Sequence, residues 1–399
     1  MTYPTISHFL ESLTGIFVPL PIQTFGFFIV LAFALGGYFI YKSFLQLELN
    51  NVLKTITIDR KRQIRSLVVD YIFNGIMSFV LGYKILYVIQ NYSLFTQSPQ
   101  KILISSEGDF LLGLIFFIIT SIYTYYVNYH NKKFTNLHVK PSQLTWNFIL
   151  VAAISGIIGA KLFAVFENID YLLQDPISAL LSFSGLTFYG GFIFGTIFVI
   201  LYAKSNNIKV SDLSDVFAPS LILAYGVGRL GCHFSGDGDW GIISDLNNKP
   251  IFLPDWLWGY KFPRNVIEFQ GDGSGIPPFG ELIEGCVGKY CYQLSHTVYP
   301  TSLYEAIFCI IAFIFLWNIR KYIKKSGTIF CIYLVINGVE RFLIEIIRIT
   351  EKYTIFPSNS IFSYPIELTQ AQIIAIIIMI IGFSGIIYLN KKTNEPIKE

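Results

Sequence analysis

Nine long apolar runs recur along the chain and set its architecture. They cover residues 24–44, 67–89, 109–129, 147–167, 185–204, 213–231, 301–319, 327–346 and 370–389. Each run is close to the roughly 20 residues that a helix needs to cross a hydrocarbon layer of about 30 Å. Backbone polar groups in lipid must be satisfied within the protein, which favours helices. The pattern predicts an all-α polytopic membrane protein with about nine transmembrane helices.

Positive charge gathers in alternate connections between these runs. Lysine and arginine are concentrated in 45–65, 130–144 and 320–326, with Lys209 between the fifth and sixth runs and further lysines in the C-terminal tail. Basic connections of membrane proteins face the cytoplasm. We therefore expect the N-terminus to lie outside and the C-terminus inside.

The outer connection 232–300 is long enough to have some structure of its own. It is rich in glycine, proline, tryptophan and acidic residues, which predicts turns and aromatic clusters. We expect a small extracytoplasmic cap. Cys286 and Cys291 lie close together in this segment, and they could pair if it faces an oxidising compartment.

An internal repeat appears when the chain is compared with itself at an offset of 77 residues. The matches are Gly82, Lys84, Asn91, Pro99, Gly108 and Gly113 with Gly159, Lys161, Asn168, Pro176, Gly185 and Gly190. Both copies are expected to start on the same side of the membrane and to run in the same direction, so the repeat is parallel and not inverted. We expect five parts: an N-terminal span with its loop (1–65), an inserted two-helix unit (66–145), core spans (146–231), the cap (232–300) and C-terminal spans (301–399).

Composition excludes a soluble protein. Hydrophobic residues make up 53% of the chain and charged residues only 14%, against roughly a quarter in soluble domains. The mean hydropathy is +0.55. The five histidines and five cysteines do not form a paired zinc-ligand spacing, so no metal is expected.

The richest polar motif is the segment 228–241, GRLGCHFSGDGDWG, at the outer end of the sixth run. Arg229 stands between glycines, and without neighbouring side chains its guanidinium group and the backbone N–H groups can approach a phosphate. An interfacial arginine that reaches lipid headgroups is the simpler alternative. Five glycines, two aspartates and a tryptophan in this segment exceed what anchoring needs, so the motif favours a functional site.

The eighth run carries a polar stripe. Asn337, Arg341, Glu345 and Arg348 are spaced four, four and three residues apart and share one helical face. Arg341 and Glu345 could form a purely structural ion pair. Arginine has five N–H donors, so Arg341 would still have some left for an anionic ligand.

Three further places carry candidate side chains. Tyr189, bracketed by glycines in the segment 184–191, is either an interfacial anchor or a group that binds a headgroup or accepts a proton. Tyr304 and Glu305 begin the seventh helix, where they orient an arginine or a substrate hydroxyl, or compensate the helix dipole. His233 is a candidate general base, since imidazole changes charge near neutral pH, but it could equally be a loop residue.

Lys161, in the outer half of the fourth run, is a lysine within an apolar span. Reaching for the interface is the ordinary explanation of such a lysine. Lys161 belongs to the copy of the repeat that adjoins Tyr189, whereas its counterpart Lys84 belongs to the other copy. We therefore expect Lys161 to reach a site more readily than Lys84.

Four motifs in this order resemble the prolipoprotein diacylglyceryl transferase family. They are GLTFYGG (185–191), GRLG with GDGDWG (228–231 and 236–241), PTSLYE (300–305) and ERFLIEIIR (340–348). The likeness covers 24–44 and 147–390, and the segment 66–145 looks like an insertion into the usual seven-span form.

The resemblance implies transfer of a diacylglyceryl group from phosphatidylglycerol to the lipobox cysteine of a prelipoprotein, at the outer side of the bacterial plasma membrane. It implies no cofactor and no nucleic-acid partner. The expected catalytic residues are Tyr189, Arg341, Glu345 and His233. The expected phosphatidylglycerol-binding residues are Arg229, Gly190, Gly191, Gly231 and Tyr304, supported by Asp237, Lys161, Glu305 and Arg348.

Two positions depart from the family pattern. Better-known members have His-Gly-Gly where this chain has Tyr189-Gly190-Gly191, and an asparagine where it has Cys232. A phenol needs an adjacent cation before it can act as a base near neutral pH. We therefore expect Tyr189 to position the headgroup or the thiol, with His233 as the alternative proton acceptor.

Two other functions fit parts of the sequence. The repeat and the intramembrane charges are also found in secondary transporters, although transporter sites lie near the bilayer midplane. A catalytically inactive lipid-binding homologue is the third reading, because the family histidine is absent. The retained Arg229, Arg341 and Glu345 favour the enzyme.

We predict that Tyr189→Phe lowers transferase activity. The measurement is thioether formation on a lipobox peptide, with His233→Ala assayed in parallel. Full activity of Tyr189→Phe together with loss of activity in His233→Ala would show that the preference for Tyr189 is wrong.

Overall fold

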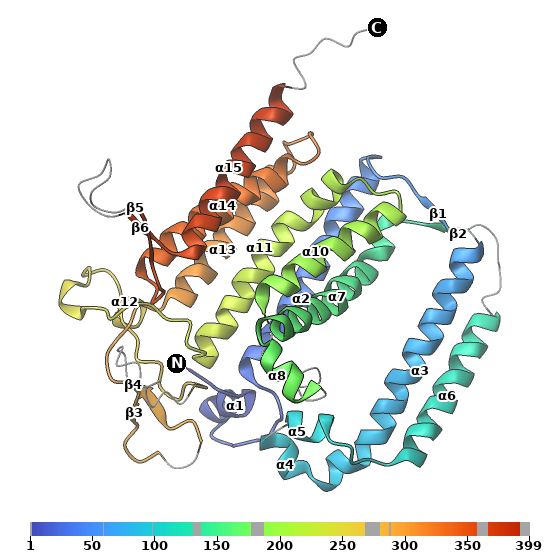
Figure 1. Ribbon diagram of the computed structural model, residues 1–399, viewed down its shortest axis with the longest axis horizontal. Helices are drawn as coiled ribbons and strands as arrows, with labels where there is room; N and C mark the ends of the chain where they lie inside the picture. Colours follow the sequence, from blue (N-terminus) through green and yellow to red (C-terminus); the bar gives the residue numbers. More distant parts are fainter. Residues whose placement is uncertain are drawn as a thin grey trace. The chain divides into compact units, whose positions relative to one another are not determined.

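The computed structural model describes residues 2–58, 60–97, 99–130, 137–176, 187–267, 280–286, 289–356 and 366–391. Within these residues nine long helices form at the predicted positions (Figure 1). They are α2 (Thr24–Leu49), α3 (Arg60–Gln90), α6 (Phe110–His130), α7 (Thr145–Glu167), α10 (Phe188–Ser205), α11 (Val210–Ser235), α13 (Thr301–Ile319), α14 (Thr328–Ile344) and α15 (Gln370–Lys391). The predicted all-α class is confirmed.

The long helices differ in how well they suit a membrane. In the described part of the chain, seven are long and apolar enough to cross a bilayer, and a shorter apolar helix corresponds to α10. α14 has only 17 residues and contains Asn337, Glu340 and Arg341. Such groups are expensive in lipid and must face protein or ligand. The chain is a multi-pass membrane protein, and α14 is not among the seven candidate spans of its described residues.

Short elements connect the long helices. The short helices are α1 (Ile6–Thr14), α4 (Tyr92–Gln97), α5 (Pro99–Ile104), α8 (Ile169–Gln174) and α12 (Asp255–Trp258), with 3₁₀ turns at Pro141–Leu144, Leu246–Asn248 and Glu345–Ile347. The strands form three antiparallel pairs: β1 (Ile56–Ile58) with β2 (Leu137–Val139), β3 (Gly280–Leu282) with β4 (Tyr292–Leu294), and β5 (Tyr353–Phe356) with β6 (Ile366–Leu368).

The chain divides into two compact units. The first unit comprises Met1–Val18, Ile22–Ile40 and Lys209–Glu399, and the second comprises Pro19–Pro21 and Tyr41–Ile208. α2 therefore contributes its first part to one unit and its last part to the other. The five-part division expected from the sequence stays a prediction.

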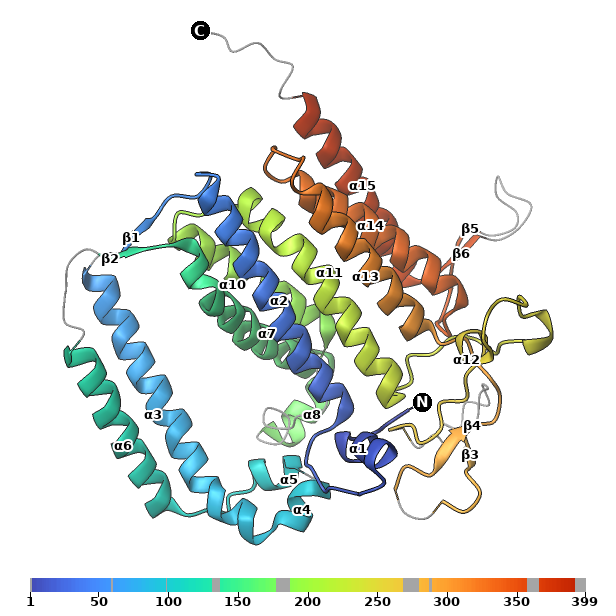
Figure 2. The same ribbon diagram turned by 180° about the vertical axis from the view of Figure 1, so that it is seen from behind.

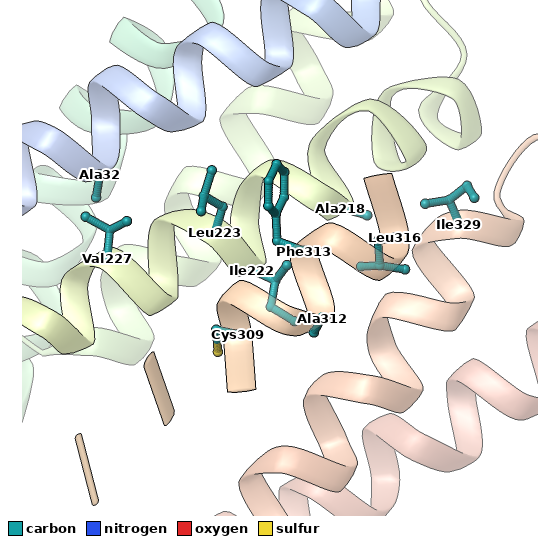
Figure 3. Close-up of a cluster of buried hydrophobic side chains, with 10 residues drawn as sticks. All are labelled: Ala32, Ala218, Ile222, Leu223, Val227, Cys309, Ala312, Phe313, Leu316 and Ile329. Carbon is teal, nitrogen blue, oxygen red and sulfur yellow. The ribbon is translucent and has the colours of Figure 1, made fainter. Parts of the chain in front are cut away.

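The core of the first unit lies among α2, α11, α13 and α14 (Figure 3). Its buried residues are Ala32, Ala218, Ile222, Leu223, Val227, Cys309, Ala312, Phe313, Leu316 and Ile329. α11 and α13 approach closely at Gly226, where an added Cβ would lie 2.7 Å from the Cβ of Cys309. Lipid is as apolar as these side chains, so close packing at small residues holds the helices together.

The beginning of α14 is fixed by α11. Asp215 accepts hydrogen bonds from the backbone N–H groups of Gly327 (2.7 Å) and Phe330 (2.8 Å). The hydroxyl of Ser326 donates to Asp212 at 2.5 Å. The first N–H groups of a helix have no partner within it, and a carboxylate suits the positive end of its dipole. These bonds set where α14 starts on α11, and thereby where its other end lies.

The predicted cap has a small core of its own. Trp240, Phe262, Leu294 and Val298 are buried together, with Tyr260 packed against them. A disulfide joins Cys286 to Cys291, the pair that the sequence left open. The cap therefore folds around aromatic side chains and one covalent link.

The second unit contains two helix pairs, α3 with α6 and α7 with α10, that repeat the same contacts. The side-chain amide of Asn91 donates to the carbonyl of Tyr87 at 3.1 Å, and that of Asn168 donates to Ala164 at 3.1 Å. Both residues of the second contact lie 77 positions after those of the first. The first helices of the two pairs therefore match at the predicted offset.

The second helix of each pair follows a different register. The backbone N–H of Asp109 donates to Tyr83 (2.8 Å), and that of Thr187 donates to Ala160 (3.2 Å). Tyr83 and Ala160 are 77 residues apart, whereas Asp109 and Thr187 are 78 apart. One extra residue before α10 accounts for the shift. In its contacts, Gly191 and not Gly190 is therefore the counterpart of Gly113.

Lys84 of α3 is buried by its own repeat unit. Its ammonium group donates to the carbonyls of Ile102 (2.9 Å) and Glu107 (2.8 Å) and to the Ser105 hydroxyl (3.0 Å). It also donates to the Ser105 carbonyl. These acceptors lie in and after α5, so Lys84 satisfies the last carbonyls of that short helix. Lys84 therefore does not reach for the membrane interface, the ordinary explanation of a lysine in an apolar span; it binds the backbone of its own repeat unit.

We predict that Lys84→Met destabilises the protein by roughly 2–4 kcal/mol, because buried carbonyls lose their donor. Thermal unfolding in detergent measures the effect. Lys54→Met is the matched control, since Lys54 is exposed in the connection after α2. An unfolding temperature equal to that of the unmodified protein in Lys84→Met would contradict the assigned role.

Candidate active site

The C-terminal ends of α11 and α14 and the N-terminal end of α13 bring charged side chains together within the first unit. α11 ends at Gly236, whose positive φ of 64° turns the chain away from the helix axis. The following segment crosses to the start of α13 and the end of α14: Gly241 N–H donates to Tyr299 (2.9 Å), and Ile242 N–H donates to Ile347 (2.9 Å). The loop motif, the start of α13 and the polar stripe at the end of α14 thus meet in one place.

Glu305 is at the centre of this cluster. Its carboxylate forms ion pairs with Arg229 Nε (2.6 Å), Arg341 Nη1 (3.2 Å) and Arg348 Nη1 (3.5 Å). Only 1% of its side chain is exposed. A carboxylate is buried at this depth only when paired cations compensate its lost hydration. The sequence assigned Glu305 a supporting role, and the geometry makes it the shared partner of three arginines.

Glu345 occupies the position expected of it beside Arg341. The two form an ion pair of 3.0 Å at a spacing of four residues, and Arg348 Nε lies 4.0 Å from the same carboxylate. The expected pairing of Arg341 with Glu345 is present, but the single helical face predicted for Asn337, Arg341, Glu345 and Arg348 is not. α14 ends at Ile344, Glu345 lies in a 3₁₀ turn, and Arg348 follows in extended backbone. Glu345 is as deeply buried as Glu305.

Asp239 completes the cluster and was missed among the candidate residues. It pairs with both Arg229 and Arg348. The hydroxyl of Thr301 donates to its backbone carbonyl at 3.1 Å, which fixes the loop on α13. The GDGDWG motif offered two aspartates, and the direction of a side chain in a glycine-rich turn is not encoded in residue spacing.

The charges of the cluster are layered. Three guanidinium groups and three carboxylates balance one another, but they are not equally open. The side chains of Glu305 and Glu345 are 1% exposed, whereas that of Arg341 is 26% exposed. Each guanidinium carries five N–H donors in a planar fork that matches phosphate oxygens. An anion approaching from the open side meets Arg341 and, beside it, Asp239, which is 22% exposed; the two glutamates lie below, and Arg229 and Arg348 are 14% exposed.

Tyr225 supports Arg229 from beneath. The guanidinium carbon lies 5.0 Å from the centre of the Tyr225 ring, one helical turn earlier on α11. This tyrosine was not among the site residues expected from the sequence. The available signal was the spacing: Tyr225 lies four residues before Arg229, so the two side chains are neighbours on one face of the helix.

Glu340 is a second residue that the sequence analysis passed over. It is buried next to Arg341 in sequence, and among the described residues neither of its carboxylate oxygens has a hydrogen-bond partner. It precedes Arg341 by one position, and the four-residue spacing from Asn337 to Arg341 therefore does not include it.

Asp237 and Cys232 lie at the edge of the cluster. Asp237 accepts the backbone N–H of Asp239 at 3.3 Å, and burial raises the pKa of Asp237 above its ordinary value. Arg229 Nη1 lies 3.9 Å from the Cys232 sulfur. Ligand atoms of Cys232, Asp237 and Asp239 lie within 4.8 Å of one another. Asp239 is already bound by two guanidinium groups, so this corner favours an anion over a cation.

His233 faces another environment, one turn beyond Arg229 on α11. It is buried, with ring centres 5.5 Å from Phe262 and 5.7 Å from Tyr260. Its Nδ1 has no hydrogen-bond partner among the described residues. It lines a cavity of about 1010 Å³ together with Tyr3 and Arg264. The structure does not bring His233 into the ion-pair cluster.

Two predicted lipid-binding residues of the first unit are engaged in packing. The hydroxyl of Tyr304 donates to the carbonyl of Leu257 in the cap at 2.5 Å. Gly231 lies against α2, where an added Cβ would be 2.8 Å from the Cβ of Phe28. Both residues hold the surroundings of the cluster in place, and their contact with lipid stays a prediction.

The remaining predicted residues belong to the second unit. Tyr189 is exposed near the start of α10, and Lys161 lies on α7. Gly190 packs against the carbonyl of Gly159, and Gly191 lies against Gly156, so both glycines serve the contact of α10 with α7. Residues 184–186 of the Tyr189 motif lie outside the described residues. The catalytic or binding roles of these residues stay predictions.

Comparison of the sequence with known proteins identifies one enzyme family. The family described as prolipoprotein diacylglyceryl transferase matches residues 111–388 of this chain. A phosphatidylglycerol–prolipoprotein diacylglyceryl transferase from Leptospira interrogans is 26% identical over 294 residues, covering 63% of this chain and 80% of that protein. One from Staphylococcus aureus is 28% identical over 252 residues, covering 63% of this chain and 76% of that protein. The matched region extends from α6 to α15 and contains every member of the ion-pair cluster. This chain therefore belongs to the prolipoprotein diacylglyceryl transferase family.

Proposed function

We propose that this protein transfers the diacylglyceryl group of phosphatidylglycerol to the thiol of the lipobox cysteine in a bacterial prelipoprotein. Glycerol phosphate is released, and the reaction is the first step of lipoprotein maturation. Family membership supports the proposal, as do the names of the relatives from Leptospira and Staphylococcus. The observation that carries it is the cluster of Arg229, Arg341 and Arg348 above two buried glutamates.

The cluster suits the charge that develops in this reaction. The cysteine sulfur forms a bond to the glyceryl carbon, the carbon–oxygen bond to phosphate breaks, and its electron pair moves onto the phosphate oxygen. The phosphate therefore gains negative charge as it leaves. Arginine N–H groups that are already oriented stabilise that charge without reorganising, an effect typically worth about 10²–10³ in rate for each such donor.

Glu305 and Glu345 act through the arginines. A long, flexible arginine loses side-chain entropy when a ligand orders it. Ion pairs with buried carboxylates fix the guanidinium groups before the lipid arrives, so less entropy is lost on binding. The two glutamates are positioning residues in this proposal, and Asp239 does the same for Arg229 and Arg348 from the loop side.

The thiol must lose its proton for sulfur to attack, because the thiolate is the nucleophile. Tyr189 and His233 are the two side chains that the sequence offers for this step. The location of His233 one turn from Arg229, on the wall of a cavity, supports it as the proton acceptor. The exposure of the Tyr189 side chain supports a role in positioning headgroup or thiol.

The same proposal places the enzyme in the bacterial plasma membrane with its site towards the outer leaflet. The basic connections on the opposite side of the helices support this orientation. The cluster lies at the ends of α11 and α14 and not near their centres. This location suits a lipid headgroup better than the midplane site of a transporter.

We predict that the purified full-length protein, given phosphatidylglycerol and a lipobox peptide, adds the mass of a diacylglyceryl group to the peptide. Mass spectrometry detects the product. The same peptide with serine in place of cysteine is the control, and it should stay unmodified. Absence of product, while a relative from the family is active in the same assay, would refute the proposed function.

We predict that Arg341→Ala lowers kcat/KM by about 10²-fold or more through loss of phosphate stabilisation. The protein should still fold, because Glu305 keeps Arg229 and Arg348 as partners. Arg320→Ala is the matched control, since Arg320 lies beside Trp317 at the opposite end of α13. Its activity should stay within about threefold of the parent. Equal activity of the two variants would contradict the assignment of Arg341.

A further inference from the structure

One loop of the cap exposes large apolar side chains in an ordered conformation. It covers residues 246–258, between the outer ends of α11 and α13, and we call it the 246–258 loop. Ile251 is 100% exposed and Phe252 is 84% exposed at its tip. Trp256 and Leu246 are exposed as well. A contiguous exposed apolar patch usually marks an interaction site.

Hydrogen bonds hold the tip in this shape. The N–H of Leu253 donates to Pro250 at 3.0 Å, which closes a turn around Ile251 and Phe252. The ammonium group of Lys249 donates to the carbonyl of Leu253 at 2.5 Å and pairs with Asp255 at 3.1 Å. The charged groups of Lys249 and Asp255 are therefore paired inside the loop, and Ile251 and Phe252 are left exposed at its tip.

The base of the loop is fixed beside the ion-pair cluster. The indole N–H of Trp258 donates to the carbonyl of Asp245 at 2.9 Å. The hydroxyl of Tyr304 donates to the carbonyl of Leu257, and Tyr304 precedes Glu305 on α13. Figures 1 and 2 show the chain beside α12 projecting away from the helices of the first unit. A rigid support thus connects the apolar tip to the helix that carries Glu305.

We propose that the tip of the 246–258 loop inserts into the outer leaflet of the bilayer at the lipid–water interface. Its support is attached to α13, a helix long and apolar enough to span the membrane, so the loop lies where that helix leaves the lipid. Its composition is that of an interfacial anchor: aliphatic and phenylalanine side chains at the tip, tryptophans behind them and a lysine at the base.

Insertion of the tip also positions the candidate active site relative to the bilayer, an inference that rests on the proposed function. A tip in the acyl region and a base attached beside Glu305 fix the height of the arginines relative to the lipid headgroups. The phosphate of a lipid in the same leaflet then lies at the level of Arg229 and Arg341. The loop is in this sense an alignment device for the donor lipid.

Photo-crosslinking tests the insertion without requiring enzyme activity. A photoreactive phenylalanine analogue replaces Phe252 in the full-length protein, reconstituted in vesicles of phosphatidylglycerol and phosphatidylethanolamine. The matched control carries the analogue at Leu282, an apolar cap residue that is 64% exposed on β3. Thermal unfolding checks that both variants fold. We expect lipid adducts at position 252 at a yield at least several times that at position 282.

Adducts from position 252 to a second copy of this chain or to another protein, or a lipid yield no higher than at 282, would overturn the proposal. Because an inactive enzyme would still crosslink to lipid, this result is independent of the transferase assay.

Kinetics test the alignment. The double variant Ile251→Ser with Phe252→Ser should raise KM for phosphatidylglycerol in vesicles by about three- to tenfold, with kcat nearly unchanged. Leu282→Ser should change neither constant. An unchanged KM in the double variant would refute the alignment role.

Discussion

The carboxylate of Glu305, shared by three arginines, is the interaction on which the candidate site depends. Burying one carboxylate without partners would cost several kcal/mol, and burying three guanidinium groups near one another would add repulsion. Together they compensate one another, since Glu305 contacts Arg229, Arg341 and Arg348 at once. Glu345 and Asp239 complete the balance from two sides. The result is a charge-balanced cluster in which Arg341 is the most exposed member and the two glutamates are the most buried.

The rest of the first unit brings these partners into register. Gly226 lets α11 and α13 approach closely, which places Arg229 against Glu305. Asp215 fixes the start of α14 on α11, so the last turn of α14 reaches the same level. Gly236 turns the chain so that Asp239 lies over Arg229 and Arg348. Each constraint is small, and the cluster needs all of them.

The cap and the repeat show two ways of supporting polar groups beside a membrane. In the cap, Tyr304 connects the 246–258 loop to the helix that carries Glu305. In the second unit, Lys84 satisfies carbonyls that a short helix leaves open. Neither role follows from charge or spacing alone. In both cases a polar side chain of a long helix donates hydrogen bonds to a neighbouring backbone segment.

The sequence by itself determined the helices and the pairing within one helix. Apolar length predicted the spans, because lipid admits little other than helices, and helical period predicted that Glu345 meets Arg341. Only the tertiary structure decided that Glu305 is the common partner, that Asp239 and Tyr225 belong to the site, and that His233 lies apart from the ion pairs. It also showed that the contacts of α10 match those of α6 at an offset of 78 residues and not 77, so that Gly191 corresponds to Gly113. Those contacts join segments far apart in the chain, and their geometry depends on helix packing and loop direction, which local periodicity does not encode.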